Sequence, residues 1–439
     1  MTEAADAVAP FFRTGNYAPV ADELTAFDLP VDGAIPPELQ GWYLRNGANP
    51  RQSTGHWFLG DGMVHGVRLE GGRAAWYRNR WVRTDSFDNP FPVYNLDGTR
   101  NLRSSVANTH VVRHAGRTLA LVESSLPYEI TNELETLGAY DFGGKLADAM
   151  TAHPKICPTT GEMHFFGYGS LTTPHVSYHR VDASGELTVS RGVDVEALTM
   201  MHDFALTAGH VVFMDLPVVF DIGLALAGEP AMPYRWDDDY GARLGVLSRD
   251  DPFGPLRWVE IEPCYVFHTV NAYDDGDSIV LQGVRYPEMW RQGSGFEAEA
   301  MPWSWTVDLV SGTVAERQLD DRAVEFPRID DRRTGSAARY AVTVGKNRLI
   351  RYDFGRDTAE EHVFGTGRDP MVPGEAVFAP AGSSSDERAG WYLTYVYDAA
   401  RDGSDLVIVD ASDFTGDPVA RVQLPQRVPY GFHGNWITD

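Results

Sequence analysis

The chain has 439 residues, of which 43% are hydrophobic, 12% aromatic and 23% charged. This composition is typical of a globular protein with a large core. The formal net charge of −25 argues against nucleic acid as a partner, because phosphate binding needs clustered Lys and Arg. Two cysteines, Cys157 and Cys264, are too few for a disulfide framework, and residues 1–20 lack the pattern of a signal peptide. We therefore expect a cytoplasmic protein.

Short alternating runs rich in Val, Tyr, Trp and Thr recur between Gly-bearing turns and predict an all-β fold. Helical patterns are rare, and the best short candidates lie in residues 132–150. Numerous hairpins without a linker favour one β-propeller domain over residues 1–439, because radial repetition removes most exposed strand edges. Five runs are interpreted as hairpins around a turn: residues 63–84, 109–124, 209–220, 276–286 and 390–412.

The longest apolar run, residues 214–228, is interrupted by Pro217 and Asp221. It is shorter than the ~20 residues that a helix needs to cross a bilayer. Two interpretations remain for it: a segment that contacts the membrane surface, or a buried helix in a cap over the propeller.

Four histidines stand out because each has Phe or Pro nearby and a predicted strand beside it: His153, His202, His268 and His433. Their wide spacing excludes a local zinc finger. In a propeller, however, each blade directs the end of an inner strand toward the axis, so distant residues can form a ring. Four neutral imidazoles suit iron, copper or zinc. Ordinary core or surface roles are expected for His65, His114, His175, His179, His210 and His362.

Metal-bound imidazoles usually donate their second N–H to a carboxylate or a carbonyl. Three glutamates in apolar sequence fit that role, Glu123, Glu325 and Glu375. Taken singly, each is better explained as a buried acid paired with Arg or as an acid at a strand end. Together with four histidines they favour a metal site.

Ten ordered motifs resemble the carotenoid cleavage oxygenases, a family that includes carotenoid-, apocarotenoid- and stilbene-cleaving enzymes. The motifs run from one end of the chain to the other: "GNYAPV" (15–20), "GWYLRNGANP" (41–50), "GDGMVHGV" (60–67), "ANTHVVRHAGRTLALVES" (107–124), "AHPK" (152–155), "HDF" (202–204), "FHTVNAYD" (267–274), "EFPRID" (325–330), "GEAVFAP" (374–380) and "GFHGNW" (431–436).

The resemblance implies a seven-bladed β-propeller, capped by loops and short helices, with Fe(II) on its axis. By motif position, the iron ligands are His153, His202, His268 and His433, and the supporting acids are Glu123, Glu325 and Glu375. Thr109 matches a threonine whose methyl group limits where O2 can bind. Phe267 and Phe326 match aromatic residues that face the substrate tunnel. The implied reaction adds both atoms of O2 across one C=C bond and yields two carbonyl products.

Stilbene-cleaving relatives tend to carry a lysine immediately before the first of these glutamates, where this chain has Val122. An apolar side chain there favours a carotenoid or apocarotenoid as substrate, with a stilbene or phenylpropenoid as the alternative. A non-catalytic polyene binder, an isomerase and a Ca2+-dependent hydrolase are further alternatives. Cys157 and Cys264 each lie four residues from a ligand candidate, which also allows a Cys2His2 zinc site, although that site would leave His202 and His433 without a role.

Overall fold

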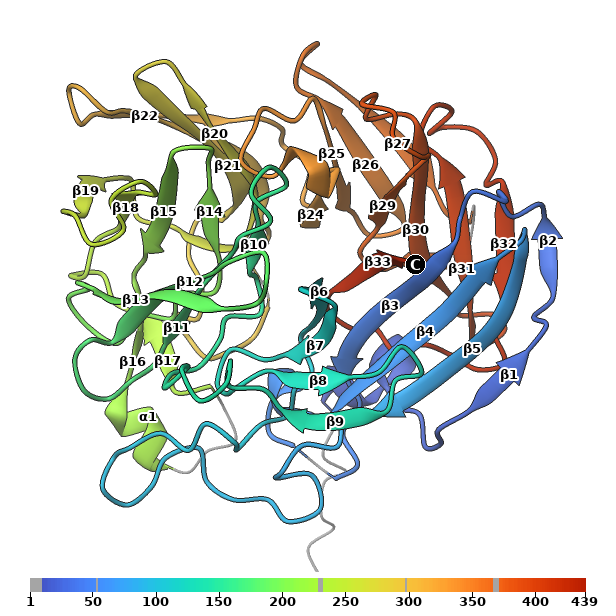
Figure 1. The fold of residues 1–439 in the computed structure, drawn as a ribbon, viewed down its shortest axis with the longest axis horizontal. Coiled ribbons are helices and arrows are strands. Elements are labelled where there is room, and N and C mark those ends of the chain that lie inside the picture. Colours follow the sequence, from blue (N-terminus) through green and yellow to red (C-terminus); the bar gives the residue numbers. More distant parts are fainter. Residues whose placement is uncertain (1–9, 53, 228–231, 297, 366–370) are drawn as a thin grey trace, which may run out of the picture.

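Seven β-sheets surround a central axis in the computed structural model (Figure 1), which describes residues 10–52, 54–227, 232–296, 298–365 and 371–439. Within these ranges each sheet has four to six strands, and neighbouring strands are antiparallel. The prediction of an all-β, seven-bladed propeller is therefore confirmed. The assignment of residues 1–439 to one domain stays a prediction.

The blades follow one another around the ring in chain order, apart from the strands at the two ends of the chain. The first blade contains β1 (Thr25–Phe27), β3 (Gly41–Ala48), β4 (Gly62–Glu70), β5 (Arg73–Trp81) and β33 (Gly434–Thr438); the second contains β6 (His110–His114), β7 (Arg117–Leu121), β8 (Tyr128–Ile130) and β9 (Thr136–Ala139). The third contains β10 (Lys155–Ile156), β11 (Met163–Tyr168), β12 (Val176–Val181) and β13 (Leu187–Val193); the fourth contains β14 (Phe204–Leu206), β15 (His210–Asp215), β18 (Arg243–Ser248) and β19 (Arg257–Glu260); the fifth contains β20 (Tyr265–Asp275), β21 (Ser278–Tyr286), β22 (Met301–Asp308) and β23 (Val314–Gln318). The sixth contains β24 (Glu325–Arg328), β25 (Tyr340–Val344), β26 (Arg348–Asp353) and β27 (Thr358–Val363); the seventh contains β2 (Val31–Gly33), β28 (Met371–Pro373), β29 (Val377–Pro380), β30 (Gly390–Asp398), β31 (Gly403–Asp410) and β32 (Ala420–Gln423).

The remaining elements are short. Strands β16 (Val218–Phe220) and β17 (Tyr234–Trp236) form a separate two-stranded sheet. The only α-helix among the described residues is α1 (Ile222–Ala227). Single 3-10 turns lie at Phe11–Arg13, Gly15–Tyr17, Trp57–Leu59 and Asp331–Arg333.

The two ends of the chain close the ring. Strand β33 completes the first blade by pairing with β3, in the register Gly41 with Thr438. Strand β2 completes the last blade by pairing with β32, in the register Val31 with Val422. Sequence-distant strands therefore share two sheets, which leaves no gap in the ring at the chain ends (Figure 1).

Three of the five predicted hairpins are confirmed: β4–β5, β6–β7 and β30–β31. The prediction for residues 209–220 is wrong, because β15 and β16 belong to different sheets. The prediction for residues 276–286 is also wrong, because β21 is one strand that pairs with β20 and β22. Its Gly276 makes the turn from β20, with φ +59°.

The helices predicted within residues 132–150 are also wrong, since this segment holds only turns and β9. Gly143 and Gly144 have φ values of +72° and +81°, and Phe142 also has positive φ. Such residues interrupt a helix, and short isolated helices are marginal in any case.

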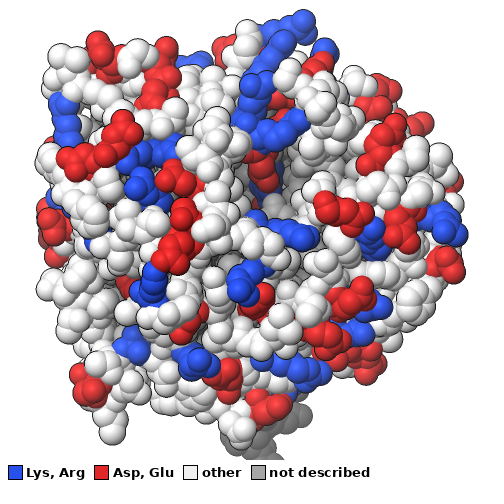
Figure 2. Space-filling model, in the orientation of Figure 1, with Lys and Arg blue, Asp and Glu red and all other residues white. Residues whose placement is uncertain are grey.

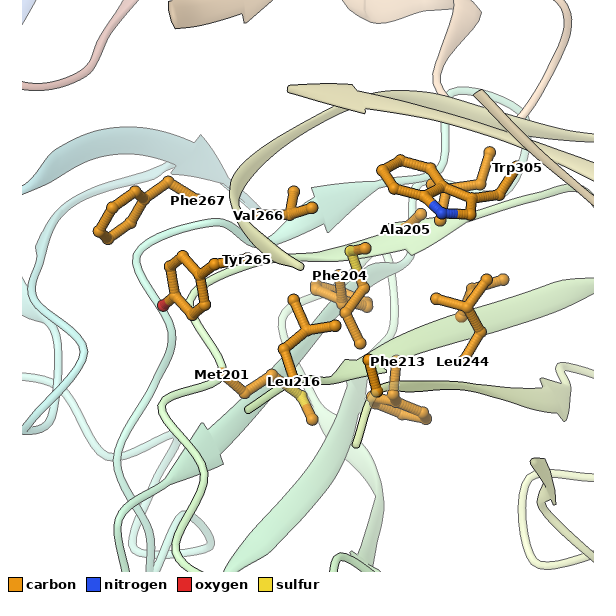
Figure 3. Close-up of a cluster of buried hydrophobic side chains, with 14 of the residues drawn as sticks. Met201, Phe204, Ala205, Phe213, Leu216, Leu244, Tyr265, Val266, Phe267 and Trp305 are labelled. Atoms are coloured by element: carbon orange, nitrogen blue, oxygen red, sulfur yellow. The ribbon is translucent and has the colours of Figure 1, made fainter. Parts of the chain in front are cut away.

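Apolar side chains fill the space between neighbouring blades. Figure 3 shows part of the largest cluster, where Phe204 and Phe213 stack with ring centroids 6.2 Å apart and Trp305 is fully buried. The alternation of inward- and outward-facing residues along each strand supplies these core layers. Packing of this kind fixes the inner strand ends against one another.

Residues 214–228 divide into two parts within the described range, which ends at residue 227. Strand β16 and the residues before it are mostly buried, whereas α1 is exposed throughout. The exposed fractions of Ile222 and Leu226 are 62% and 79%. The interpretation of this segment as a buried cap helix is therefore wrong. No described helix is both long enough and apolar enough to cross a membrane.

Candidate metal centre

The four singled-out histidines converge at the axis. His153, His202 and His433 lie one or two residues before the inner strands β10, β14 and β33, and His268 lies within β20 where its pairing with β21 shifts register. All four side chains are buried, and their candidate ligand nitrogens lie within 4.8 Å of one another. Four blades thus direct one imidazole each to the same point.

The Nε2 atoms face one another. Those of His153 and His202 are 3.0 Å apart, those of His202 and His268 are 3.3 Å apart, and those of His268 and His433 are 3.1 Å apart. Burial lowers the pKa of His153 and of His433 well below that of a free imidazole, and the neighbouring histidines lower it further. Neutral imidazoles with converging lone pairs fit a borderline divalent metal ion.

Three of the rings are oriented by glutamates. His202 Nδ1 lies against Glu123 Oε1, His268 Nδ1 donates to Glu325 Oε2 at 2.5 Å, and His433 Nδ1 donates to Glu375 Oε1 at 2.8 Å. A proton held on Nδ1 leaves the Nε2 lone pair free for a metal. The structure thus places the three glutamates beside three of the four histidines.

The charge of the His268–Glu325 pair follows from its surroundings. Burial would lower the pKa of His268, but the carboxylates of Glu325, Asp203 and Glu375, with Glu325 contributing most, together raise it. Burial would likewise raise the pKa of Glu325, but His268 lowers it. Both shifts favour a carboxylate that holds a proton on Nδ1 of His268.

A second set of side chains holds the glutamates, and the sequence analysis did not identify it. The Tyr168 hydroxyl donates to Glu123 Oε2, and the Tyr286 hydroxyl donates to Glu325 Oε1 at 2.8 Å. Arg328 Nη1 donates to Glu375 Oε2 at 3.2 Å. Each glutamate therefore has one oxygen for an imidazole and one for an outer donor, which fixes its orientation.

The backbone at Glu325 and Phe326 is unusual. Pairing between β24 and β25 shifts register here, and Phe326 has φ +51°. Its N–H donates to Glu325 Oε2 at 2.7 Å. Positive φ is uncommon for a bulky residue and costs of the order of 1 kcal/mol. The conformation aims Glu325 at the metal centre and places Phe326 beside His268, with ring centroids 5.4 Å apart.

Asp203 joins two of the ligand-bearing segments. It is buried and accepts hydrogen bonds from the N–H and the hydroxyl of Thr269, both at 2.8 Å. Its other oxygen lies 2.8 Å from Lys155 Nζ. Asp203 follows His202 and Thr269 follows His268 directly, so these contacts fix the distance between the two ligands.

One side of the histidine ring opens into a cavity of about 460 Å3, hereafter the apolar cavity. Thr109, Val122, Phe267 and Phe326, which the sequence analysis assigned to O2 access or substrate contact, all line it. Thr109 donates its hydroxyl to Asn108 Oδ1 at 2.8 Å, so this hydroxyl already has a hydrogen-bond partner. The remaining lining is rich in aromatic residues and includes Tyr17, Trp57, Phe58, Tyr168, Tyr234, Tyr286, Phe296, Tyr430 and Phe432.

The other side opens into a polar channel of about 690 Å3, hereafter the axial channel. It is lined by residues of the inner strands β6, β10, β20, β24 and β33 or next to them, so it follows the propeller axis. Figure 2 shows a hollow near the centre of this face with Lys and Arg around it. The charged lining residues are Arg113, Lys155, Asp203, Arg328, Asp331, Arg332, Glu375 and Asp439.

His110, which the sequence analysis did not assign, also lines the axial channel, with its ring centroid 5.3 Å from that of His433. Its Nδ1 donates to the Ala152 carbonyl at 2.7 Å, and its Nε2 lies 3.3 Å from Asn435 Nδ2. Both ring nitrogens thus have partners, and His110 lies outside the four-histidine group. Neither Cys157 nor Cys264 belongs to that group, so the geometry does not support the Cys2His2 alternative.

Comparisons with known proteins agree with this geometry. The family model described as "Retinal pigment epithelial membrane protein" matches residues 17–438. A carotenoid cleavage oxygenase of Mycobacterium tuberculosis is 38% identical, over 99% of this chain and 98% of the relative. A carotenoid 9,10(9',10')-cleavage dioxygenase of Crocus sativus is 33% identical, over 98% of this chain and 89% of the relative.

Two solved structures share the fold over 98% of both chains. Cobalt-substituted ACO, the apocarotenoid oxygenase of Synechocystis, has a TM-score of 0.86 at 26% identity. The lignostilbene dioxygenase of Pseudomonas brassicacearum has a TM-score of 0.88, also at 26% identity. With its four-histidine centre and matches over nearly its whole length, this chain belongs to the carotenoid cleavage oxygenase family.

Proposed function

We propose that this protein is a non-haem Fe(II) dioxygenase that cleaves a C=C bond of a carotenoid or apocarotenoid with O2 and releases two carbonyl products. The observation that carries the proposal is the ring of four buried imidazoles at the wall of a mainly apolar cavity that is rich in aromatic residues. The similarity to carotenoid-cleaving enzymes supports the substrate class.

The donor set supports iron as the metal. Imidazole nitrogens suit several first-row metals, and His153, His202, His268 and His433 would hold the ion. Bound Fe(II) supplies redox chemistry that activates O2, whereas Zn(II) has no accessible redox state. Glu123, Glu325 and Glu375 keep protons on the Nδ1 atoms and so preserve the ligand geometry.

The apolar cavity positions the alkene and excludes water. A conjugated polyene offers no strong hydrogen-bonding groups along its length, so shape and dispersion along Phe267, Phe326 and Val122 fix its place. The depth at which the chain lies beside the histidines then decides which bond is cleaved. Thr109, at the cavity wall, limits the space available for O2.

Cleavage of a stilbene or phenylpropenoid is the second candidate, supported by the likeness to the lignostilbene dioxygenase. Val122, which is buried and apolar, weighs against it, because a phenol oxygen next to Val122 would lack a hydrogen-bond donor there.

One preparation tests the proposal. Metal analysis of the purified protein is followed by incubation with an apocarotenal and with resveratrol under 18O2. We expect iron, and from the apocarotenal two carbonyl products that each carry 18O. Cleavage of only the stilbene would overturn the substrate class. Unlabelled isomers would indicate isomerisation, and the absence of O2 consumption would indicate a polyene binder.

We also propose a cytoplasmic protein that contacts the membrane surface through α1. The exposed apolar side chains of Ile222, Leu224 and Leu226 support this contact, since an apolar substrate would enter from lipid. Flotation with phosphatidylcholine liposomes tests it. We expect co-flotation that is lost in Ile222→Ser/Leu226→Ser, and a wild-type protein that stays in the soluble fraction would refute it.

A further inference from the structure

One cation lines the apolar cavity without a carboxylate partner. The charged lining residues are Arg100, Glu123 and Glu325, and both glutamates are engaged with histidines. No described carboxylate lies within 4.0 Å of the Arg100 guanidinium, although most arginines of this acidic chain form such ion pairs. The half-buried guanidinium of Arg100 can therefore offer hydrogen bonds and a positive charge to a ligand in this mainly apolar cavity.

The guanidinium is held in place from several sides. Arg100 and Tyr94 form an isolated β-bridge, and the guanidinium carbon lies 5.6 Å from the Tyr94 ring centroid. Arg100 Nη1 donates to the Tyr168 carbonyl. Arg100 Nη2 lies against Gly169, where a β-carbon would be only 2.7 Å away. Tyr94 also donates its hydroxyl to the Gly169 carbonyl at 2.7 Å, which ties this loop to the end of β11.

Two side chains that line the cavity each have a polar atom without a partner among the described residues. Arg100 Nε is buried and makes no hydrogen bond to any described residue. Tyr234 is only 8% exposed and lines the cavity, and its hydroxyl makes no hydrogen bond to a residue that the structure describes. Tyr94, Arg100 and Tyr234 all line the apolar cavity, and burial raises the pKa of Tyr234.

We propose that Arg100 and Tyr234 form a subsite for the oxygenated end of an apocarotenoid, binding a terminal carboxylate or carbonyl. This inference rests on the proposed function and names its preferred substrate. A carbonyl oxygen can accept hydrogen bonds from both residues, and a carboxylate also neutralises the guanidinium. A hydrocarbon end would leave both donors without partners once water is excluded.

The subsite gives the substrate a direction. A group of aromatic residues also lines the cavity, in which Tyr17 and Trp57 have ring centroids 5.2 Å apart and Trp57 and Phe296 have ring centroids 6.1 Å apart. No described aromatic pair joins this group to Tyr94 or Tyr234. An apolar ring suits the aromatic group and an oxygenated end suits Arg100, so a substrate with unlike ends binds in one orientation. Orientation then selects the bond that lies beside the histidines.

The test uses the iron-loaded full chain and three probes: an apocarotenal, the apocarotenoic acid of the same length, and a carotene hydrocarbon. Binding is measured by quenching of tryptophan fluorescence, because Trp57 lines the cavity, and cleavage by kcat/KM. We expect the acid to bind most tightly and the hydrocarbon most weakly. Arg100→Met should weaken acid binding about tenfold or more and leave hydrocarbon binding unchanged.

Three further variants sharpen the result. Arg100→Lys should keep part of the preference for the acid, and Tyr234→Phe should weaken both oxygenated probes by a smaller factor. The matched control is Arg103→Met, since the Arg103 side chain is 54% exposed and pairs with Asp85 at 2.6 Å. It should bind all three probes like the wild type.

The subsite and the proposed function fail in different ways. Equal losses for all three probes in Arg100→Met, or no loss, would overturn the subsite even if every polyene is cleaved. If no polyene is cleaved but acid binding still depends on Arg100, the subsite stands and the oxygenase proposal fails.

Discussion

The two hollows that meet at the histidine ring differ in chemistry. The apolar cavity contains Glu123 and Glu325, and tyrosine hydroxyls hold both acids. The axial channel contains Glu375, and a guanidinium, that of Arg328, holds it. Neutral donors therefore support the imidazole–carboxylate pairs on the apolar side, and a charged donor supports the pair on the other side. The metal centre lies at the boundary between these two environments.

Removing an imidazole should have the largest effect, because the four-histidine group lies where the two hollows meet. In His268→Ala and His433→Ala, we expect the iron content to fall from about one equivalent per chain to background and cleavage to be abolished. Circular dichroism should remain that of a β-protein, since strand pairing and large apolar clusters hold the blades. Metal content and O2 consumption measure the effect.

The matched control for these variants is His175→Ala. Among the described residues, the His175 ring donates only to the nearby Ser170 carbonyl at 2.8 Å, and it lies outside the four-histidine group. Iron retained in His268→Ala would show that the four histidines do not act as one site.

Replacing one glutamate from each hollow should show that the two hollows support their acids differently. Glu325→Gln is expected to weaken iron retention about ten- to a hundredfold with little change in stability, because Tyr286 can hold an amide as well as a carboxylate. Glu375→Gln should do the same and also lower the free energy of unfolding by about 1–3 kcal/mol, since it leaves the mostly buried Arg328 guanidinium without this carboxylate.

Chelator competition and urea unfolding measure these two quantities. Equal stability of the two variants would contradict the distinction between a neutral and a charged support. Asp331 and Asn435 also contact Arg328, which keeps the expected loss moderate.

A charge placed in the apolar cavity tests its dryness. Val122→Lys puts an ammonium at a position that is 8% exposed, next to an acid already engaged with His202. We expect kcat/KM for an apocarotenal to fall about tenfold or more, because the buried charge is not compensated. Val122→Ile is the control and should retain most activity. Unchanged polyene cleavage in Val122→Lys would show that water reaches this part of the cavity.

The sequence predicted the centre of this site better than its surroundings. The four histidines and three glutamates could be found because each lies in a short motif beside an inner strand. Tyr168 and Tyr286 could not, since both appear as ordinary aromatic residues within strands and their partners lie 45 and 39 residues away. Arg328 lies within the motif "EFPRID", but its contact with Glu375 could not be predicted because Glu375 comes from another blade.

The errors in the fold have a similar cause. Residues 209–220 alternate like a hairpin, yet the chain leaves one sheet at Leu216 and Pro217 and enters another. Local patterning specifies a strand but not its partner, because pairing is decided by tertiary packing. The charged lining of the axial channel could not be predicted from the sequence for the same reason, since its charges come from six different segments of the chain.

The two cysteines also differ in their surroundings, and their pKa values shift in opposite directions. Burial alone would raise the pKa of Cys157, but hydrogen bonds from Thr159, Thr160 and Arg249 outweigh it and lower that pKa to about 6. Burial raises the pKa of Cys264 to about 12. Thiolate absorbance at 240 nm should therefore titrate near pH 6 with one equivalent per chain, and Cys157→Ser should remove it while Cys264→Ser should not.

The titration also predicts how stability varies with pH. The folded pKa of Cys157 lies below the usual thiol value of about 8.5, so the folded state loses the thiol proton at lower pH than the unfolded state. Its contribution to stability is complete above about pH 8.5 and fades as the pH falls through about 6. Urea unfolding of the wild type should therefore show a rise in stability across this window that Cys157→Ser lacks. Because Cys157 lies outside the four-histidine group, both proteins should bind the same amount of iron, and a loss of iron in Cys157→Ser would connect this thiol to the metal centre after all.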